Sequence, residues 1–251
     1  ALPISFAGVN GSGKHNNWSL ATDAGDNLFS PGSTPSQNAR FLLFLAAFIK
    51  GVDEYQELLR CSVAFAGNDH RLGAQEAPPA IISVFLGEEL EAIVDSIVND
   101  HDYTDRKRKS LRIGVDVLPA IPKDTTDRNR TSPVAFTGNK FEFRSLGSSQ
   151  SIAGPNTILN TIMAEELEQF AEELEGVKDF SSALHELIKR VFTEHQRILF
   201  SGNGYDESWI AEAERRGLAN LHNTAEALPA YILPKNIQLM TSHGVYSEAE
   251  M

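Results

Sequence analysis

The chain has 251 residues and a formal net charge of −12, in a composition that is ordinary for a globular protein with one large domain or two small ones. The acidic charge argues against a nucleic-acid surface over the whole chain. Cys61 is the single cysteine, so an internal disulfide is excluded and a reducing compartment is expected.

The elements expected along the chain are strands first and helices last. The first half is expected to hold short strands around a glycine-rich loop (1–20), a buried helix (38–61) capped by Ser36 or Asn38, a β-rich run (80–86), an acidic helix (87–99), and strands and loops (111–143). The second half is expected to hold helices at 156–177, 181–199, 206–221 (capped by Asp206) and 223–251. This layout predicts an α+β fold. It divides into a sheet region, 1–155, which includes the buried helix 38–61, and a helical region, 156–251.

No membrane segment is expected. The strongest apolar run, residues 41–49, is too short to span a bilayer, and the first residues lack the charged segment that opens a signal peptide. The chain opens on a strand-like run at 4–7 that has no preceding partner, and it stops at 247–250 as a helical turn begins. We therefore expect a fragment of a longer protein.

The glycine loop near the start ends in a histidine that could ligate a metal. Residues 8–14 fit the spacing of a phosphate loop, G-x-x-x-x-G-K. His15 follows, where magnesium binding needs a Ser or Thr hydroxyl, and the next residues start no good helix, so a phosphate loop is not expected. A neutral imidazole is a good ligand for Mn²⁺ and an acceptable one beside carboxylates. The alternative is a hydrogen-bonded loop histidine.

A strand around residue 142 presents charges at every second position. Lys140, Glu142 and Arg144 share one face of an extended chain, while Phe141 and Phe143 point the other way, into a core. A carboxylate between two cations should be firmly ionised. A surface strand with cross-strand ion pairs would give the same pattern, so the strand alone leaves both interpretations open.

Two irregular segments carry arginines that suit an anionic ligand. Residues 103–144 hold ten Lys/Arg and five Asp/Glu inside an otherwise acidic chain, which favours a small anion over a polyanion. Arg128 and Arg130 can grip phosphate or carboxylate with paired N–H groups. A second segment places Arg71 close to Glu76, which nearby prolines hold extended.

The order of these segments resembles the catalytic domain of glutamine synthetase. The chain carries Asn-Gly-Ser-Gly-x-His (10–15), Arg-Leu-Gly (71–73) with Glu-Ala-Pro (76–78), Arg-Asn-Arg-Thr (128–131) and Phe-Glu-Phe-Arg (141–144). Segment 127–133 and the long spacer before it are similar to the type III branch. The resemblance covers most of the chain, as far as Ala230. It implies that both regions belong to one catalytic domain, an antiparallel curved sheet followed by a helical C-terminal part.

The resemblance implies roles for residues at a metal and a nucleotide. His15 and Glu142 would be two ligands of the metal, Mg²⁺ or Mn²⁺, that bridges the phosphates of ATP. The residues that would lie along the nucleotide are Asn17, Ser19, Arg130 and Lys140. Lys140 and Ala135 stand where many relatives have arginine.

The resemblance also implies roles around glutamate. The residues that would contact this substrate are Asn10, Gly11, Arg71 and Arg144, the two arginines through its carboxylates. Arg130 would stabilise the phosphoryl group in flight, and Glu76 would take a proton from ammonium. Metal and arginine would cancel the charge of two anions that must meet, and the nucleophile would need a carboxylate base.

The function implied is ATP-dependent ligation of ammonium to the γ-carboxylate of glutamate, through γ-glutamyl phosphate, to give glutamine. The alternatives are a γ-glutamyl amine or polyamine ligase of the same superfamily, and a non-catalytic structural or nitrogen-sensing relative. The family implies a ring-shaped homo-oligomer, expected as a dodecamer, in the cytoplasm or an organelle. Its other metal glutamates and small N-terminal domain would lie upstream, so the chain alone is expected to be inactive.

Overall fold

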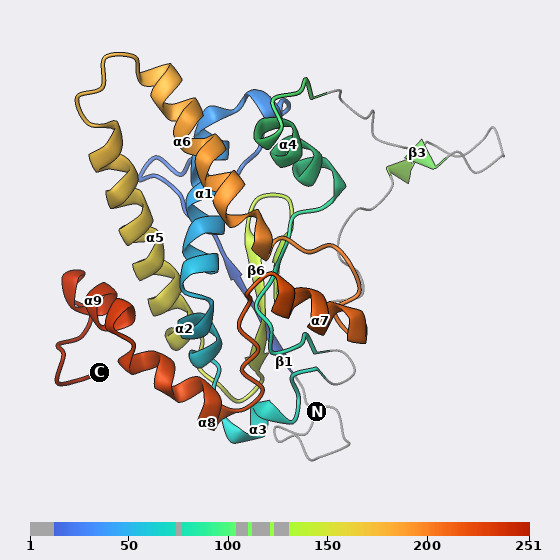
Figure 1. Cartoon of the computed structure of the whole chain (residues 1–251), viewed down its shortest axis with the longest axis vertical. Helices are drawn as coiled ribbons and strands as arrows, with labels where there is room; N and C mark the ends of the chain where they lie inside the picture. Colours follow the sequence, from blue (N-terminus) through green and yellow to red (C-terminus); the bar gives the residue numbers. More distant parts are fainter. Residues whose placement is uncertain (1–12, 74–76, 104–109, 112–120, 123–130) are drawn as a thin grey trace.

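The computed structural model describes residues 13–73, 77–103, 110–111, 121–122 and 131–251 (Figure 1). The predicted site residues Asn10, Gly11, Glu76 and Arg130 lie outside the described residues, as does the strand expected at 4–7. None of the described helices combines the length and the apolar character needed to cross a membrane.

Two largely buried helices, α1 (Ala39–Glu54) and α2 (Gln56–Cys61), form the centre of the fold. Asn38 caps α1, because its side-chain oxygen accepts a hydrogen bond from the backbone N–H three residues later at 3.1 Å. Of the two caps that the sequence allowed, Ser36 and Asn38, the structure shows Asn38. The single helix expected over 38–61 is broken at Tyr55, whose φ of −114° and ψ of 25° depart from helical values.

A four-stranded sheet packs against α1. Its strands, in spatial order, are β1 (Gly13–Trp18), β6 (Phe141–Gly147), β5 (Val134–Phe136) and β2 (Val84–Phe85). β1–β6 and β5–β6 are antiparallel, but β2 pairs parallel with β5. The expectation of a purely antiparallel sheet is therefore wrong at β2, because a long connection that includes a helix separates β2 from β5 and permits parallel pairing. Strands β3 (Ser110–Leu111) and β4 (Ile121–Pro122) pair with each other, apart from this sheet.

Aromatic side chains fill the space between the sheet and α1. Phe141 of β6 stacks on Phe48 of α1 with ring centroids 3.6 Å apart, and Phe29 meets both rings edge-on. Trp18 of β1 packs against Phe29 and Phe48. Phe143 is buried with them, which confirms that Phe141 and Phe143 face the core, although Arg144 is buried as well. The side chains that alternate with these aromatics are turned away from the core.

The remaining helices surround this centre. They are α3 (Ala66–Asp69), α4 (Glu88–Val98), α5 (Ala153–Leu174), α6 (Phe180–His195), α7 (Glu207–Arg215), α8 (Thr224–Ala227) and α9 (Pro234–Ser242), with 3₁₀ turns at Pro35–Gln37, Gln196–Ile198 and Leu228–Ile232. The Asp206 side chain caps α7 as predicted, but this helix ends early, just before Gly217 takes a left-handed φ of 72°. Helix α1 packs against both α5 and α6 (Figure 1). The α+β class is confirmed, and the division at residue 155 stays a prediction.

Candidate functional site

His15 and Glu142 meet on the outer face of the β1–β6 pair. Antiparallel pairing places Asn17 opposite Glu142, and the register shifts between Lys14 and Asn16, at His15. Such a bulge re-aims a side chain. His15 Nδ1 lies 2.8 Å from Glu142 Oε1. The two residues, far apart in sequence, thus lie on neighbouring antiparallel strands with their side chains in contact.

Glu142 is held between Arg144 and His15. Arg144 Nε donates to Glu142 Oε2 at 2.9 Å, and Arg144 Nη2 lies 2.9 Å from the same oxygen. Burial raises the pKa of the Glu142 carboxyl, but the hydrogen bonds and charges of Arg144 and His15 outweigh it, so the pKa lies below its usual value. Arg144 is only 4% exposed, so the alternative of a surface ion pair is wrong for this residue.

A second buried arginine, Arg71, reaches β6 from the segment that follows α3. Its Nη2 donates to the Arg144 carbonyl at 3.1 Å, and its Nη1 to Asn68 Oδ1 at 3.4 Å. Burial lowers the pKa of its guanidinium. Its Nε is buried and has no hydrogen-bond partner among the described residues. A buried N–H without a partner costs free energy, so an acceptor on a ligand would be favoured here.

Position 13 requires a glycine because the guanidinium of Arg71 lies against the backbone there. A Cβ atom at Gly13 would lie 2.0 Å from Arg71 Nη2 and 2.6 Å from its Cζ, so no larger residue fits without a shift. Because glycine has no side chain, a neighbouring group can lie close to its backbone. At Gly13 this neighbour is the guanidinium of Arg71.

Three of the four residues expected along a nucleotide lie on or beside the same two strands, and the fourth, Arg130, is outside the described residues. Asn17 is exposed on β1, and Lys140 directly precedes β6. Ser19 stabilises the turn after β1, since its Oγ lies 3.0 Å from Asn27 Oδ1 and 3.1 Å from the Asn139 carbonyl. Ser19 therefore has a local structural role, and the nucleotide contacts of all three residues stay predictions.

The donor pair at His15 and Glu142 fits a divalent metal. Imidazole nitrogen and carboxylate oxygen are both ligands that Mn²⁺ accepts, and Mg²⁺ takes carboxylates. Two ligand atoms at ~2.1 Å from one ion and about 90° apart are about 3 Å from each other. The observed separation of 2.8 Å matches such adjoining ligands. Arg144 would keep the carboxylate oriented from its other oxygen.

The sequence did not single out Asn68, which the structure places between α3 and β6. This side chain is buried and bonds to carbonyls of two segments as well as to Arg71. The one signal in the sequence is its position three residues before Arg71, about one helical turn.

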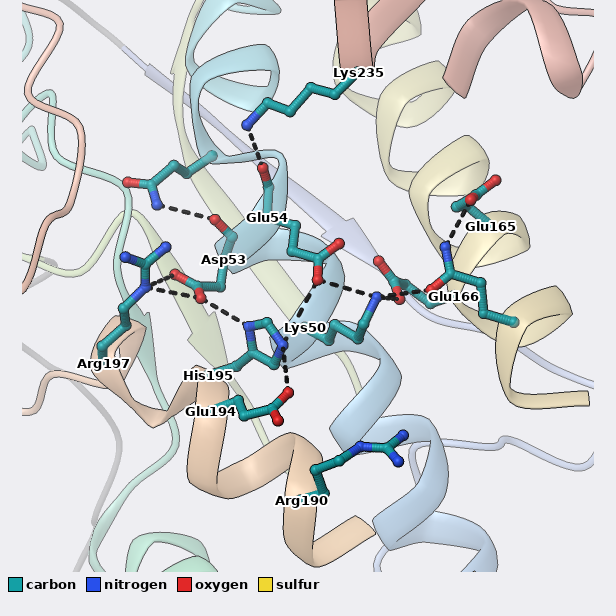
Figure 2. Close-up of polar contacts among 12 residues, drawn as sticks. Lys50, Asp53, Glu54, Glu165, Glu166, Arg190, Glu194, His195, Arg197 and Lys235 are labelled. Atoms are coloured by element: carbon teal, nitrogen blue, oxygen red, sulfur yellow. Dashed lines mark hydrogen bonds and ion pairs between the residues drawn. The ribbon is translucent and has the colours of Figure 1, made fainter. Parts of the chain in front are cut away.

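A second buried polar cluster lies where α1 meets α5 and α6 (Figure 2). Lys50 of α1 pairs with Glu166 of α5. Asp53 of α1 lies 2.8 Å from His195 Nδ1 and accepts from Arg197 Nε at 2.9 Å. Burial raises the pKa of Glu166 to about 7. These contacts join three helices, and the cluster is interpreted as structural.

Known proteins are similar to this chain over nearly its whole length. A family model described as the glutamine synthetase C-terminal domain matches residues 183–251. The chain is 53% identical over 249 residues to a type-3 glutamine synthetase of Dictyostelium discoideum, and 45% identical over 253 residues to a glutamine synthetase of Bacteroides fragilis. These matches cover 98% of the chain but only 34% and 35% of the relatives, so the chain spans about a third of their length. By sequence, the chain belongs to the glutamine synthetase family.

Proposed function

We propose that the protein containing this chain joins ammonium to the γ-carboxylate of glutamate while it cleaves ATP to ADP and phosphate. The observation that carries the proposal is one cluster, in which the His15–Glu142 pair lies beside the buried guanidinium groups of Arg144 and Arg71. Relatives named glutamine synthetase support the proposal at the level of the family.

The first half of this reaction brings two anions together, the carboxylate of glutamate and the terminal phosphate of ATP. Bound Mg²⁺ or Mn²⁺, held by His15 and Glu142, would supply charge neutralisation there. Arg71 and Arg144 would hold the carboxylates of glutamate. The Nε–H of Arg71, which has no partner among the described residues, is one donor available for this contact.

The residues outside the described part complete the proposal. A γ-carboxylate oxygen attacks the γ-phosphorus, the bond to ADP breaks, and Arg130 stabilises the charge in transfer. Glu76 takes a proton from ammonium, and the resulting ammonia attacks the acyl carbon while phosphate leaves with the bonding pair and takes up the second proton that the nitrogen releases. Asn10 and Gly11 contact glutamate. The residues proposed to lie along ATP are Arg130 and, within the described part, Asn17, Ser19 and Lys140.

We propose further that residues 1–155 and 156–251 form parts of one catalytic domain within a ring-shaped homo-oligomer in the cytoplasm. The described residues offer two ligands at this metal site, His15 and Glu142. The other ligands would come from the part of the relatives' length that this chain does not span.

Metal binding and glutamine formation by the full-length protein test the proposal. His15→Ala and Glu142→Gln are each expected to weaken Mn²⁺ binding, measured by calorimetry, by ~100-fold or more, because each removes a ligand and not merely a supporting contact. Glutamine formation should fall with metal occupancy. His243→Ala is the matched control, because His243 Nε2 also lies 2.8 Å from a glutamate, Glu165, at another group of metal-competent side chains.

Two results would replace the proposal. If His243→Ala weakens Mn²⁺ binding and His15→Ala does not, the metal site is at the other cluster. If the wild-type protein forms γ-glutamyl amides from amines but no glutamine from ammonium, the protein is an amine ligase of the same superfamily.

A further inference from the structure

Asn68 joins α3 to the end of β6. The residue is 2% exposed, and its Nδ2 donates to the Ser145 carbonyl at 2.9 Å and to the Val63 carbonyl at 3.0 Å. Both protons of the side-chain amide are thus used by carbonyls from two different segments. The side chain cannot rotate without breaking these bonds, so its Oδ1 has one fixed direction.

That fixed oxygen faces Arg71. Arg71 Nη1 donates to Asn68 Oδ1 at 3.4 Å, while Nη2 donates to the Arg144 carbonyl at 3.1 Å. The two bonds involve different arms of a planar group, so together they fix its plane. The backbone at Gly13 limits movement on the Nη2 side, where a Cβ would lie 2.0 Å away. The Nε–H is left without a partner among the described residues.

We infer that Asn68 is a positioning residue that holds the guanidinium of Arg71 in the orientation that receives a glutamate carboxylate. The inference rests on the proposed function, in which Arg71 binds glutamate. It gives Asn68 no contact with the substrate and no part in the chemistry. Loss of one hydrogen bond to a charged group corresponds to about tenfold in affinity.

Gln150 offers a matched control, because it also makes hydrogen bonds at the junction between the Val63 carbonyl and the end of β6. Its Nε2 donates to the same Val63 carbonyl at 3.2 Å, and its Oε1 accepts from the Gly147 N–H at 2.8 Å. In the described part of the chain it makes no hydrogen bond to Arg71. Gln150→Ala therefore loosens the junction but leaves the partners of the guanidinium in place.

Asn68→Asp separates orientation from packing. An aspartate keeps an oxygen that accepts from Arg71, but it loses the two donors to the Ser145 and Val63 carbonyls. The variant should lower the melting temperature, since two buried carbonyls lose their donor. In this variant the charged guanidinium of Arg71 itself holds the carboxylate oxygen in place, through a stronger charge-assisted hydrogen bond, so glutamate affinity should be kept.

Steady-state kinetics of the full-length protein, with each substrate varied in turn, provide the test. Asn68→Ala should raise the glutamate KM by about tenfold and change the ATP KM by less than about twofold. Gln150→Ala and Asn68→Asp should lower the melting temperature but keep the glutamate KM of the wild type. Arg71→Ala gives the KM expected when the guanidinium is absent.

Several outcomes overturn the inference. One is a wild-type glutamate KM in folded Asn68→Ala, and another is an equal rise in Gln150→Ala, which would assign the effect to the junction as a whole. If Asn68→Ala raises the ATP KM as much as the glutamate KM, the effect also belongs to the junction as a whole and not to the orientation of Arg71. If Asn68→Ala does not fold, Asn68→Asp decides, because a KM as high as that of Arg71→Ala rules out positioning. If the wild-type protein makes no glutamine, both the proposed function and this inference are wrong. If the wild type is active and the variants are unaffected, only the inference is wrong.

Discussion

Gly13 has no side chain, and for that reason the guanidinium of Arg71 can lie against β1. A methyl group at this position would lie 2.0 Å from Nη2, so either the arginine or the strand must move. We expect Gly13→Ala to lower the free energy of unfolding by about 1–3 kcal/mol, as overpacking does. The glutamate KM should rise by about tenfold or more, because a displaced cation binds its ligand poorly. Denaturant unfolding and steady-state kinetics measure the two effects.

Gly67→Ala is the control for this substitution. The added Cβ would lie 2.8 Å from Cε1 of Phe65, but that ring is 53% exposed and can rotate away. Its glutamate KM should match the wild type. If the KM of Gly13→Ala is also unchanged, Arg71 is not held in place for glutamate.

At the scale of single residues, the sequence predicts which residues could carry chemistry better than it predicts which residues contact one another. His15 and Glu142 are 127 positions apart, and their pairing was expected only because the order of motifs resembles a known family. Gly13 and Asn68 could not be assigned in this way. A glycine at the start of a strand and an asparagine in a short helix are common, and the roles of these two residues depend on a guanidinium that the packing of α3 against β6 brings close to them.

Helices α1 and α5 approach each other closely around a buried carboxyl, Glu166. A Cβ at Gly51 of α1 would lie 3.3 Å from Glu166 Cγ, and Glu166 is 0% exposed, with one oxygen that has no partner among the described residues. Burial raises its pKa from 4.5 to about 7, although the hydrogen bond and charge of Lys50 oppose the rise. Burial lowers the pKa of Lys50, but its contacts with Glu166 and Glu54 raise it overall, so the amine stays charged in this range.

The raised pKa makes this helix pair sensitive to pH. Between about pH 4.5 and about pH 7 the folded state keeps a proton on Glu166 that the unfolded state loses, so stability falls as pH rises through this window and levels off above it. The contribution of Glu166 should be on the order of 3 kcal/mol. Urea unfolding at several pH values from about 5 to about 8 should show a shallower fall for Glu166→Gln than for the wild type.

A carboxyl elsewhere on α5 provides the comparison. Glu173 is exposed and paired with Arg190, whose hydrogen bond lowers the Glu173 pKa, so it titrates below the window. Glu173→Gln should keep the pH dependence of the wild type. An equal fall in stability for Glu166→Gln and the wild type would show that another group titrates.

Among the elements, helices were more predictable than strands. Periodicity and capping residues such as Asn38 and Asp206 mark where α1 and α7 begin. The break at Tyr55 is not signalled by any glycine or proline there. Strand β2 pairs with β5 through only two residues, too few for alternation to be visible, and its direction is set by tertiary packing.

On the scale of the whole protein, the proposed reaction depends on residues beyond any single element. The chain spans about a third of the length of its relatives, and Glu76 and Arg130 lie outside the described residues. Their proposed roles fall in different halves of the reaction, since Arg130 acts in phosphoryl transfer and Glu76 acts afterwards, on ammonium. Substitutions at these two positions should therefore separate the two halves of the proposed reaction in the full-length protein.

Glu76→Ala should slow glutamine formation by about 10²–10⁴, the usual contribution of a general base. Glutamate-dependent ATP cleavage should largely persist, because γ-glutamyl phosphate still forms and water hydrolyses it. Arg130→Ala should instead suppress both ATP cleavage and glutamine formation, by ~10²-fold or more, as loss of an electrostatic clamp does. The measurement is the amount of ADP and of glutamine released in the same samples. The two amounts should be equal in the wild type and in Arg130→Ala, whereas ADP should exceed glutamine in Glu76→Ala. The role of Glu76 as the base is contradicted if Glu76→Ala makes glutamine at the wild-type rate, or if it loses ATP cleavage as completely as Arg130→Ala does.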